Sequence, residues 1–179
     1  MKLIEILKEL NKPFYTINDI EKLLRKHNKK SLYVILTRLT ESGKLIRLKN
    51  GLYTLPENIK DIEIIANQIY FPSYLSFESA LSKWGLISQI PYTLMFSTFK
   101  KTKKINLLNY QIEYRMLKKE LFFGYIKLEN GLFIATPEKA LFDLIYLSRF
   151  GKIYFDINSI DLDKIDAKKL NKMIEKFIK

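Results

Sequence analysis

The stretch KLIRLKNGLYTL, Lys44–Leu55, decides how the first third of this chain is interpreted. Apolar and polar residues alternate on both sides of Asn50-Gly51, which predicts two β-strands joined by a tight turn. Asn-Gly is favoured in such a turn because both central residues of a type I′ turn have positive φ. The stretch therefore predicts a β-hairpin, and Arg47 and Lys49 make it basic.

Two short helices are predicted at the start of the chain. Apolar residues at helical spacing predict a first helix over residues 2–11, which Pro13 ends. Thr16 is expected to be the N-cap of a second helix, with Asp19 three positions later in a variant of the capping box.

A third helix is predicted directly before the hairpin. It follows a polar turn at residues 25–30, begins at Ser31 or a neighbour, and ends at Gly43. Three short helices and a basic hairpin are typical of a winged helix-turn-helix, which places one helix in the DNA major groove. We therefore expect a DNA-binding domain of this kind over residues 1–56. A winged helix that serves as a protein–protein interaction module is the alternative.

The residues expected to contact DNA lie on the outward side of the third helix, on the hairpin and at the start of the second helix. Arg38 can donate two hydrogen bonds to a guanine, and lysines can hold the phosphate backbone. Tyr15 and Thr16 can donate to a phosphate from the start of the second helix. The complete predicted set is Tyr15, Thr16, Lys29, Lys30, Ser31, Tyr33, Val34, Thr37, Arg38, Arg47, Lys49 and Asn50.

The charge distribution agrees with a polyanionic partner. The 179-residue chain has a formal net charge of +12, and 47% of its residues are hydrophobic, which is enough for a packed core. Residues 1–55 hold 12 basic and 5 acidic residues, whereas residues 56–179 hold 19 and 14. Such an excess favours nucleic acid or an acidic membrane surface. A composition that is merely rich in lysine is the alternative explanation.

The remainder of the chain predicts a helical linker and a second domain. Residues 57–72 show apolar residues at helical spacing up to Pro72, and Ser76 is expected to cap the next helix. Strands and helices then alternate through residues 73–179. We expect an α+β protein whose C-terminal domain is mixed α/β with a small, mostly antiparallel sheet.

Four lysines in five residues follow a strand predicted over residues 92–99. Their mutual repulsion is relieved when a polyanion or an acidic partner binds, so they form a possible second basic patch in a hairpin-like loop. A solvated loop tip is the alternative. The four residues are Lys100, Lys101, Lys103 and Lys104.

Residue types that support catalysis are scarce. The chain has no cysteine, His27 is its single histidine, and no phosphate-binding glycine motif is present. Lys139 and Asp143 are interpreted as an i,i+4 ion pair worth about 0.3 kcal/mol. We expect no catalytic residue, metal or cofactor; a metal-dependent nuclease that uses Glu113 is the enzymatic alternative.

No apolar run reaches the roughly 18 residues that a membrane span needs. The N-terminus carries charges throughout and lacks the apolar core of a secretory signal. We therefore expect a soluble, cytoplasmic protein that acts as a monomer or a homodimer.

Several segments resemble the AbiEi family, the antitoxin and transcriptional repressor component of type IV toxin–antitoxin (abortive phage infection) systems. The resembling segments are GKLIRLKNGLYTLP before the linker, YLSFESALSKWGLI at 74–87, the basic stretch after a strand at 92–104, and LFIATPEKALFDLIYL at 132–147.

The resemblance implies an N-terminal domain that binds inverted repeats in double-stranded promoter DNA and represses its own operon. It implies a C-terminal antitoxin domain over residues 73–179 and a nucleotidyltransferase-like toxin as a functional, if not physical, partner. The family supplies no catalytic residues. The alternative is a winged-helix regulator without a toxin, whose C-terminal domain dimerises or senses a ligand.

Overall fold

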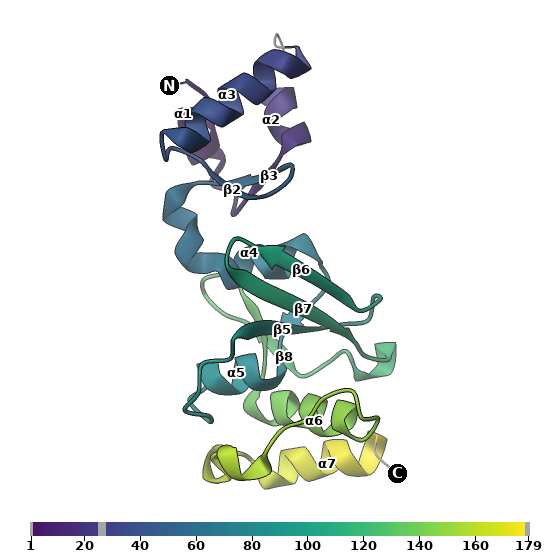
Figure 1. Ribbon diagram of the computed structural model, residues 1–179. Helices are drawn as coiled ribbons and strands as arrows, with labels where there is room; N and C mark the ends of the chain where they lie inside the picture. Colours follow the sequence, from purple (N-terminus) through teal and green to yellow (C-terminus); the bar gives the residue numbers. More distant parts are fainter. Residues whose placement is uncertain (1, 25–27, 178–179) are drawn as a thin grey trace. The chain divides into compact units, whose positions relative to one another are not determined.

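The computed structural model describes residues 2–24 and 28–177 and divides the chain into two compact units (Figure 1). The first unit holds the residues up to Ile65 together with Asn106–Asn109. The second holds Ala66–Ile105 and the residues from Tyr110 onward. Residues 25–27, which include His27 and half of the predicted turn, lie outside the described residues.

The N-terminal unit combines three helices with a three-stranded sheet (Figure 1). Its elements are α1 (Lys2–Leu10), β1 (Tyr15–Thr16), α2 (Ile17–Leu23), α3 (Lys29–Glu41), β2 (Ile46–Lys49) and β3 (Leu52–Thr54). The strand order is β1-β3-β2, and both pairings are antiparallel. The short strand β1 therefore joins the hairpin that β2 and β3 form.

Side-chain caps set the starts of α2 and α3. The hydroxyl of Thr16 accepts from the backbone N–H of Asp19, and the Asp19 carboxylate accepts from the backbone N–H of Thr16, so the predicted capping box is confirmed. The Asn28 side chain accepts from the backbone N–H of Ser31 at 2.8 Å. Because Asn28 caps the helix, α3 begins at Lys29, inside the segment predicted to be a turn.

The hairpin forms where it is predicted, but its turn differs. Gly51 has φ +73°, whereas Asn50 is not among the described residues with positive φ, so the turn is not type I′. The register shifts within β2: Arg47 lies opposite Tyr53, and Lys49 lies opposite Leu52. A β-bulge with one glycine in the left-handed conformation gives the two strands the right-handed twist of a hairpin. It needs a single residue with positive φ, whereas a type I′ turn needs two.

The core of the N-terminal unit is apolar. Helices α1, α2 and α3 are amphipathic. Each buries its apolar face against the hairpin and exposes its polar face. The buried cluster consists of Leu3, Leu7, Tyr15, Ile20, Leu32, Leu36, Leu45, Tyr53 and Leu55.

The segment predicted to be a helical linker is helical. It forms a 3₁₀ helix, η1 (Pro56–Asp61), followed by α4 (Ile62–Ile69). Ile62, Ile65 and Ala66 of α4 are buried, as their helical spacing predicts.

A six-stranded sheet forms the centre of the C-terminal unit (Figure 1). Its strands are β4 (Tyr74–Leu75), β5 (Thr93–Thr98), β6 (Lys103–Leu107), β7 (Tyr110–Met116), β8 (Tyr125–Lys127) and β9 (Phe133–Ala135), in the order β6-β7-β5-β4-β9-β8.

The prediction of a small, mostly antiparallel sheet is confirmed only in part, because the sheet of this unit is mixed. β5 pairs parallel with β7 and β4 pairs parallel with β9, whereas β4–β5 and β8–β9 are antiparallel. After β5 the chain forms β6 at the sheet edge and returns as β7 beside β5, so β5 and β7 run in the same direction. The predicted hairpin-like loop at residues 100–104 is therefore wrong, because β5 and β6 are not neighbours.

Helices cover the sheet. The α-helices are α5 (Phe77–Lys83), α6 (Pro137–Ser148) and α7 (Ala167–Phe177), with 3₁₀ turns η2 (Lys119–Leu121), η3 (Ile157–Ser159) and η4 (Leu162–Lys164). α6 begins as predicted, with Thr136 as N-cap and Pro137 at the first position. It packs against α5 and α7, and most of its residues are buried. No helix of the described chain is long and apolar enough to cross a membrane.

Candidate nucleic-acid interface and buried polar cluster

The outward face of α3 carries five of the twelve residues predicted to contact DNA. Tyr33 and Val34 are 55% and 50% exposed, while Leu32 and Leu36 on the opposite side are 2% exposed. Lys30, Thr37 and Arg38 are exposed on the same side as Tyr33 and Val34, and Ser31 is half-buried in the first turn. Lys29 is the first residue of α3, and its side chain lies outside the part of the chain that the structure describes.

The hairpin residues of the predicted set are also exposed. Arg47 and Lys49 lie on β2, and Asn50 lies in the turn. The Arg47 guanidinium donates to the side-chain oxygen of Asn50, which holds both polar groups at the hairpin tip. Lys44 is a further exposed basic residue, between α3 and β2, that the predicted set left out. Its position directly after Gly43, at the start of the predicted basic hairpin, is the sequence signal that could have identified it.

Tyr15 does not belong to this surface, and its predicted role is wrong. The residue is 0% exposed. Its hydroxyl donates to the carbonyl of Leu7 and accepts from the backbone N–H of Lys12 at 3.0 Å. Burial raises the pKa of the phenol. The reason is the pairing of β1 with β3, which directs this side chain into the core.

Thr16 is also corrected, because the capping box uses both functions of its hydroxyl. The hydroxyl donates to Asp19 Oδ2 at 2.6 Å and accepts from the Asp19 backbone N–H at 3.1 Å. These hydrogen bonds from Thr16 lower the pKa of the Asp19 carboxyl. The hydroxyl has no proton left to donate to a phosphate. Thr16 therefore serves to start α2 and is not in a position to donate to DNA.

The exposed surface that remains is cationic. Lys30 and Arg38 lie on α3, and Lys44 and Lys49 lie on or beside the hairpin. Within the described part of the chain none of these four has an acidic partner. Their charges are therefore available to phosphate groups, which is the requirement for backbone positioning on a duplex.

The second basic patch is exposed but partly compensated. Lys104 Nζ lies 3.0 Å from Glu113 Oε1, a pair close enough for attraction although it lacks hydrogen-bond geometry. Lys103 Nζ lies 4.9 Å from the Tyr70 ring centroid, and Lys100 Nζ lies 5.4 Å from it. Lys101 is exposed as well. A polyanion is therefore not needed to relieve the repulsion, because the unit supplies a carboxylate and an aromatic ring.

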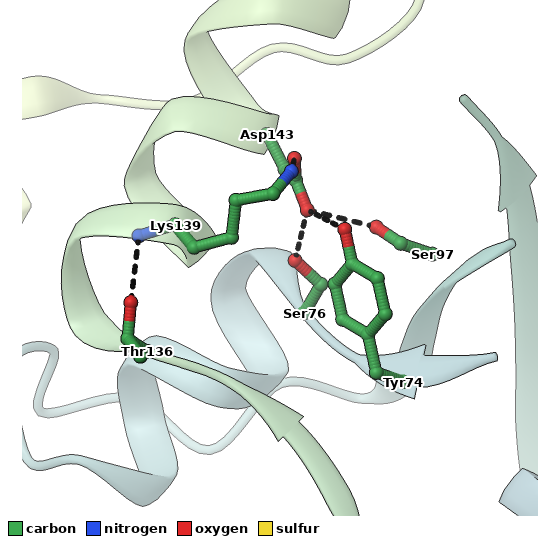
Figure 2. Close-up of polar contacts among 6 residues, drawn as sticks. All are labelled: Tyr74, Ser76, Ser97, Thr136, Lys139 and Asp143. Carbon is green, nitrogen blue, oxygen red and sulfur yellow. Dashed lines mark hydrogen bonds and ion pairs between the residues drawn. The ribbon is translucent and has the colours of Figure 1, made fainter. Parts of the chain in front are cut away.

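A buried polar cluster in the C-terminal unit is the feature that sequence reasoning missed (Figure 2). Asp143 Oδ2 accepts from the hydroxyls of Tyr74 at 3.0 Å, Ser76 at 2.7 Å and Ser97 at 2.9 Å, and Oδ1 accepts from Lys139 Nζ. Lys139 and Asp143 are both 0% exposed. The predicted i,i+4 pair is confirmed, but the small energy expected for it is wrong, because that value applies to an exposed pair and this one is buried away from water.

The surroundings of Lys139 are aromatic. Its ammonium lies 4.9 Å from the Phe123 ring centroid, 5.0 Å from that of Phe142 and 5.6 Å from that of Tyr74. Burial lowers the pKa of Lys139, and the negative charge of Asp143 opposes that shift. A Cβ on Gly124, whose φ is +71°, would lie 3.0 Å from the Lys139 Cγ, so a side chain here would be strained and would require the lysine to shift.

The cluster joins segments that are far apart in the sequence. Tyr74 comes from β4, Ser97 from β5 and Asp143 from α6, and Ser76 occupies the N-cap position of α5. Ser76 gives its hydroxyl to Asp143 and makes no side-chain cap bond. Because all five side chains are fully buried, the cluster holds the sheet and two helices together and offers no access to a substrate.

The described residues include no group of three or more His, Cys, Asp or Glu side chains that could hold a metal ion. No protein-family model matches the chain, and no curated protein matches it.

Proposed function

We propose that the protein is a sequence-specific DNA-binding transcriptional repressor whose N-terminal unit is a winged helix-turn-helix. The observation that carries the proposal is the outward face of α3, where Tyr33, Thr37 and Arg38 are exposed opposite the buried Leu32 and Leu36. A helix with this division can enter a major groove while its other side remains in the core.

The order of elements supports the same proposal. Three helices come before the β2–β3 hairpin, and β1 joins that hairpin as a third strand. This arrangement fits a winged helix-turn-helix in which α3 reads base edges and the hairpin, with Arg47 and Lys49, contacts the flanking backbone or minor groove.

The antitoxin role rests on the resemblance to the AbiEi family. In this role the protein would bind inverted repeats in its own promoter, and its C-terminal unit would counteract a nucleotidyltransferase-like toxin without being an enzyme. A regulator without a toxin, whose C-terminal unit dimerises or senses a ligand, is the second candidate. An adjacent nucleotidyltransferase gene whose toxicity this chain relieves in a growth assay would favour the first candidate.

A gel-shift titration on the DNA upstream of the gene tests the DNA-binding proposal. The full chain should bind that DNA more tightly than a scrambled duplex, with an affinity that falls as salt rises. The Lys30→Ala/Arg38→Ala variant should lose both affinity and preference, whereas Arg149→Ala, an exposed arginine of the C-terminal unit, should retain them. Equal binding by all three proteins would reject α3 as the reading helix.

A further inference from the structure

A cavity of about 310 Å³ opens in the C-terminal unit where the loop after α5 meets the segment before η3 and η3 itself. Polar side chains line much of it: Glu78 from α5, Ser88 and Gln89 from the loop, and Asn158 from η3. Pro91 and Phe155 contribute apolar walls. The cavity shares no lining residue with the buried polar cluster or with the residues proposed to contact DNA.

Glu78 is unlike the other acidic groups that this unit shields from water. Asp143 accepts from four donors, and Glu113 has Lys104 and Arg115 within ion-pair distance. The Glu78 carboxylate has no hydrogen-bond or ion-pair partner in the described chain. Partial burial raises the pKa of this carboxyl. A partly desolvated anion without a partner is unfavourable, and a cation that enters the cavity would relieve it.

Exposed apolar residues adjoin the cavity-lining segments in the sequence. Among the described residues, the three large apolar side chains with the highest exposure are Ile90 at 91%, Tyr154 at 90% and Tyr92 at 83%. Each is the chain neighbour of a residue that lines the cavity: Ile90 and Tyr92 flank Pro91, and Tyr154 precedes Phe155. Large apolar side chains with such exposure, carried on the segments that form a polar pocket, favour a protein-interaction surface.

Aspartates are concentrated in the segment that contributes Phe155 and η3 to the cavity. Residues 154–166 contain four aspartates and one lysine, in a chain with a formal net charge of +12. The lysine, Lys164, pairs with Asp161 at 2.9 Å. Asp166 Oδ2 also lies 3.4 Å from Lys169 Nζ, so two of the four aspartates are already paired, and the unpaired Glu78 carboxylate is the group that would attract a cationic side chain.

We propose that this cavity, which we name the Glu78 socket, docks a partner protein that inserts an arginine side chain flanked by apolar residues. The guanidinium would pair with the Glu78 carboxylate, and the side-chain oxygens of Gln89 and Asn158 are further acceptors in the cavity wall. Apolar residues beside the arginine would cover Ile90, Tyr92 and Tyr154. An arginine in a pocket with an apolar surround is the arrangement that dominates many interfaces. The proposal does not depend on DNA binding.

Fluorescence anisotropy with the full chain tests the socket. The probe is a fluorescein-labelled peptide, GSLLRLLSG, and its matched control carries citrulline, the neutral isostere, in place of arginine. The wild-type protein should bind the arginine peptide roughly tenfold more tightly than the citrulline peptide, because only the former supplies a charge to Glu78. Glu78→Gln should remove that difference, whereas Glu175→Gln, an exposed acid on α7 that does not line the cavity, should keep it.

The apolar part of the surface has a separate test. Ile90→Ser/Tyr92→Ser should weaken both peptides by a similar factor and leave their ratio unchanged. Equal affinity of the wild type for the two peptides, or no binding up to millimolar protein, overturns the proposal. Competition by N-acetylarginine amide with the affinity of the whole peptide also overturns it, because the socket would then be a small-molecule site. A dimer that forms with rising concentration and is lost in Glu78→Gln would assign the socket to a second copy, against the proposal.

Discussion

Helices α3 and α6 place their charged residues in opposite environments. On α3, Lys30 and Arg38 are exposed and have no acidic partner in the described chain. On α6, Lys139 and Asp143 are 0% exposed, and each is held by the other and by the surrounding side chains. Charged residues are thus exposed to solvent on one helix and hold the interior of the unit together on the other.

The difference comes from how many sides of each helix are covered. One face of α3 packs on the apolar core of its unit, so the other faces remain exposed to solvent. The sheet, α5 and α7 surround α6, so a polar residue on nearly any face of it must find its partner inside the protein. Variants that remove charges from the two helices should therefore separate into those that unfold the protein and those that abolish binding.

The largest effect is expected for Asp143→Asn. The variant leaves the buried Lys139 ammonium without an anion, which should lower the free energy of unfolding by about 3–5 kcal/mol. Urea denaturation followed by circular dichroism measures it. Asp161→Asn, which breaks the exposed pair with Lys164, is the control and should leave the midpoint nearly unchanged. If the unfolding curves of Asp143→Asn and the wild type coincide, the charged pair of α6 does not stabilise the fold, and the proposed difference between α3 and α6 is wrong.

Arg38→Ala should have the next largest effect, and on binding alone. Loss of a bidentate contact to guanine costs about 1–3 kcal/mol and relaxes the preference at one base pair. Gel-shift titrations on single-base operator variants measure this change. The urea midpoint should stay at the wild-type value, because the side chain is exposed. A large loss of stability would show instead that Arg38 supports the fold, as Lys139 does in α6.

Tyr15→Phe tests a predicted DNA contact that lies in the core. Removal of the hydroxyl deletes its hydrogen bonds to the Leu7 carbonyl and the Lys12 N–H and should cost about 1 kcal/mol of stability. DNA affinity should not change. Tyr33→Phe, on the exposed face of α3, should keep the wild-type urea midpoint. Weaker DNA binding by folded Tyr15→Phe would return this residue to the interface.

The smallest effect is a pH dependence at the start of α2. Because hydrogen bonds from Thr16 lower the pKa of Asp19, the ionised carboxylate stabilises the folded state. That contribution is fully present above the unfolded-state pKa of about 3.9 and is lost as pH falls through the lower folded-state pKa. Urea midpoints of the wild type and Asp19→Asn, measured from pH 7 to pH 2, should differ at neutral pH and converge in acid. A constant difference would mean that the capping hydrogen bonds do not depend on the charge.

Local chemistry explains which features the sequence predicts well. The capping box of Thr16 and Asp19, the Thr136-Pro137 start of α6 and the position, though not the type, of the hairpin turn at Gly51 all depend on residues within a few positions of one another. Partners of this kind meet whatever the rest of the chain does, so propensity and spacing are sufficient to find them.

Long-range pairing explains what the sequence does not predict. Tyr15 is buried because β1 pairs with β3, which lies almost forty residues later. Asp143 receives hydroxyls from Tyr74, Ser76 and Ser97, which lie 69, 67 and 46 positions away. Ser76 was expected to cap α5, a local role, and serves a distant carboxylate. The Glu78 socket likewise depends on two segments about seventy residues apart, and no local pattern brings them together.

The carboxylate of Asp143 also fixes the rotational setting of α6. A helix that is apolar on most sides can turn about its axis or slide by a turn at little cost, because one aliphatic contact replaces another. Rotation of α6 by one residue, about 100°, would withdraw Asp143 from three hydroxyls that have no access to water. The helix therefore has a single favourable rotation about its axis. The elements that pack on α6, including α7, are positioned by that rotation.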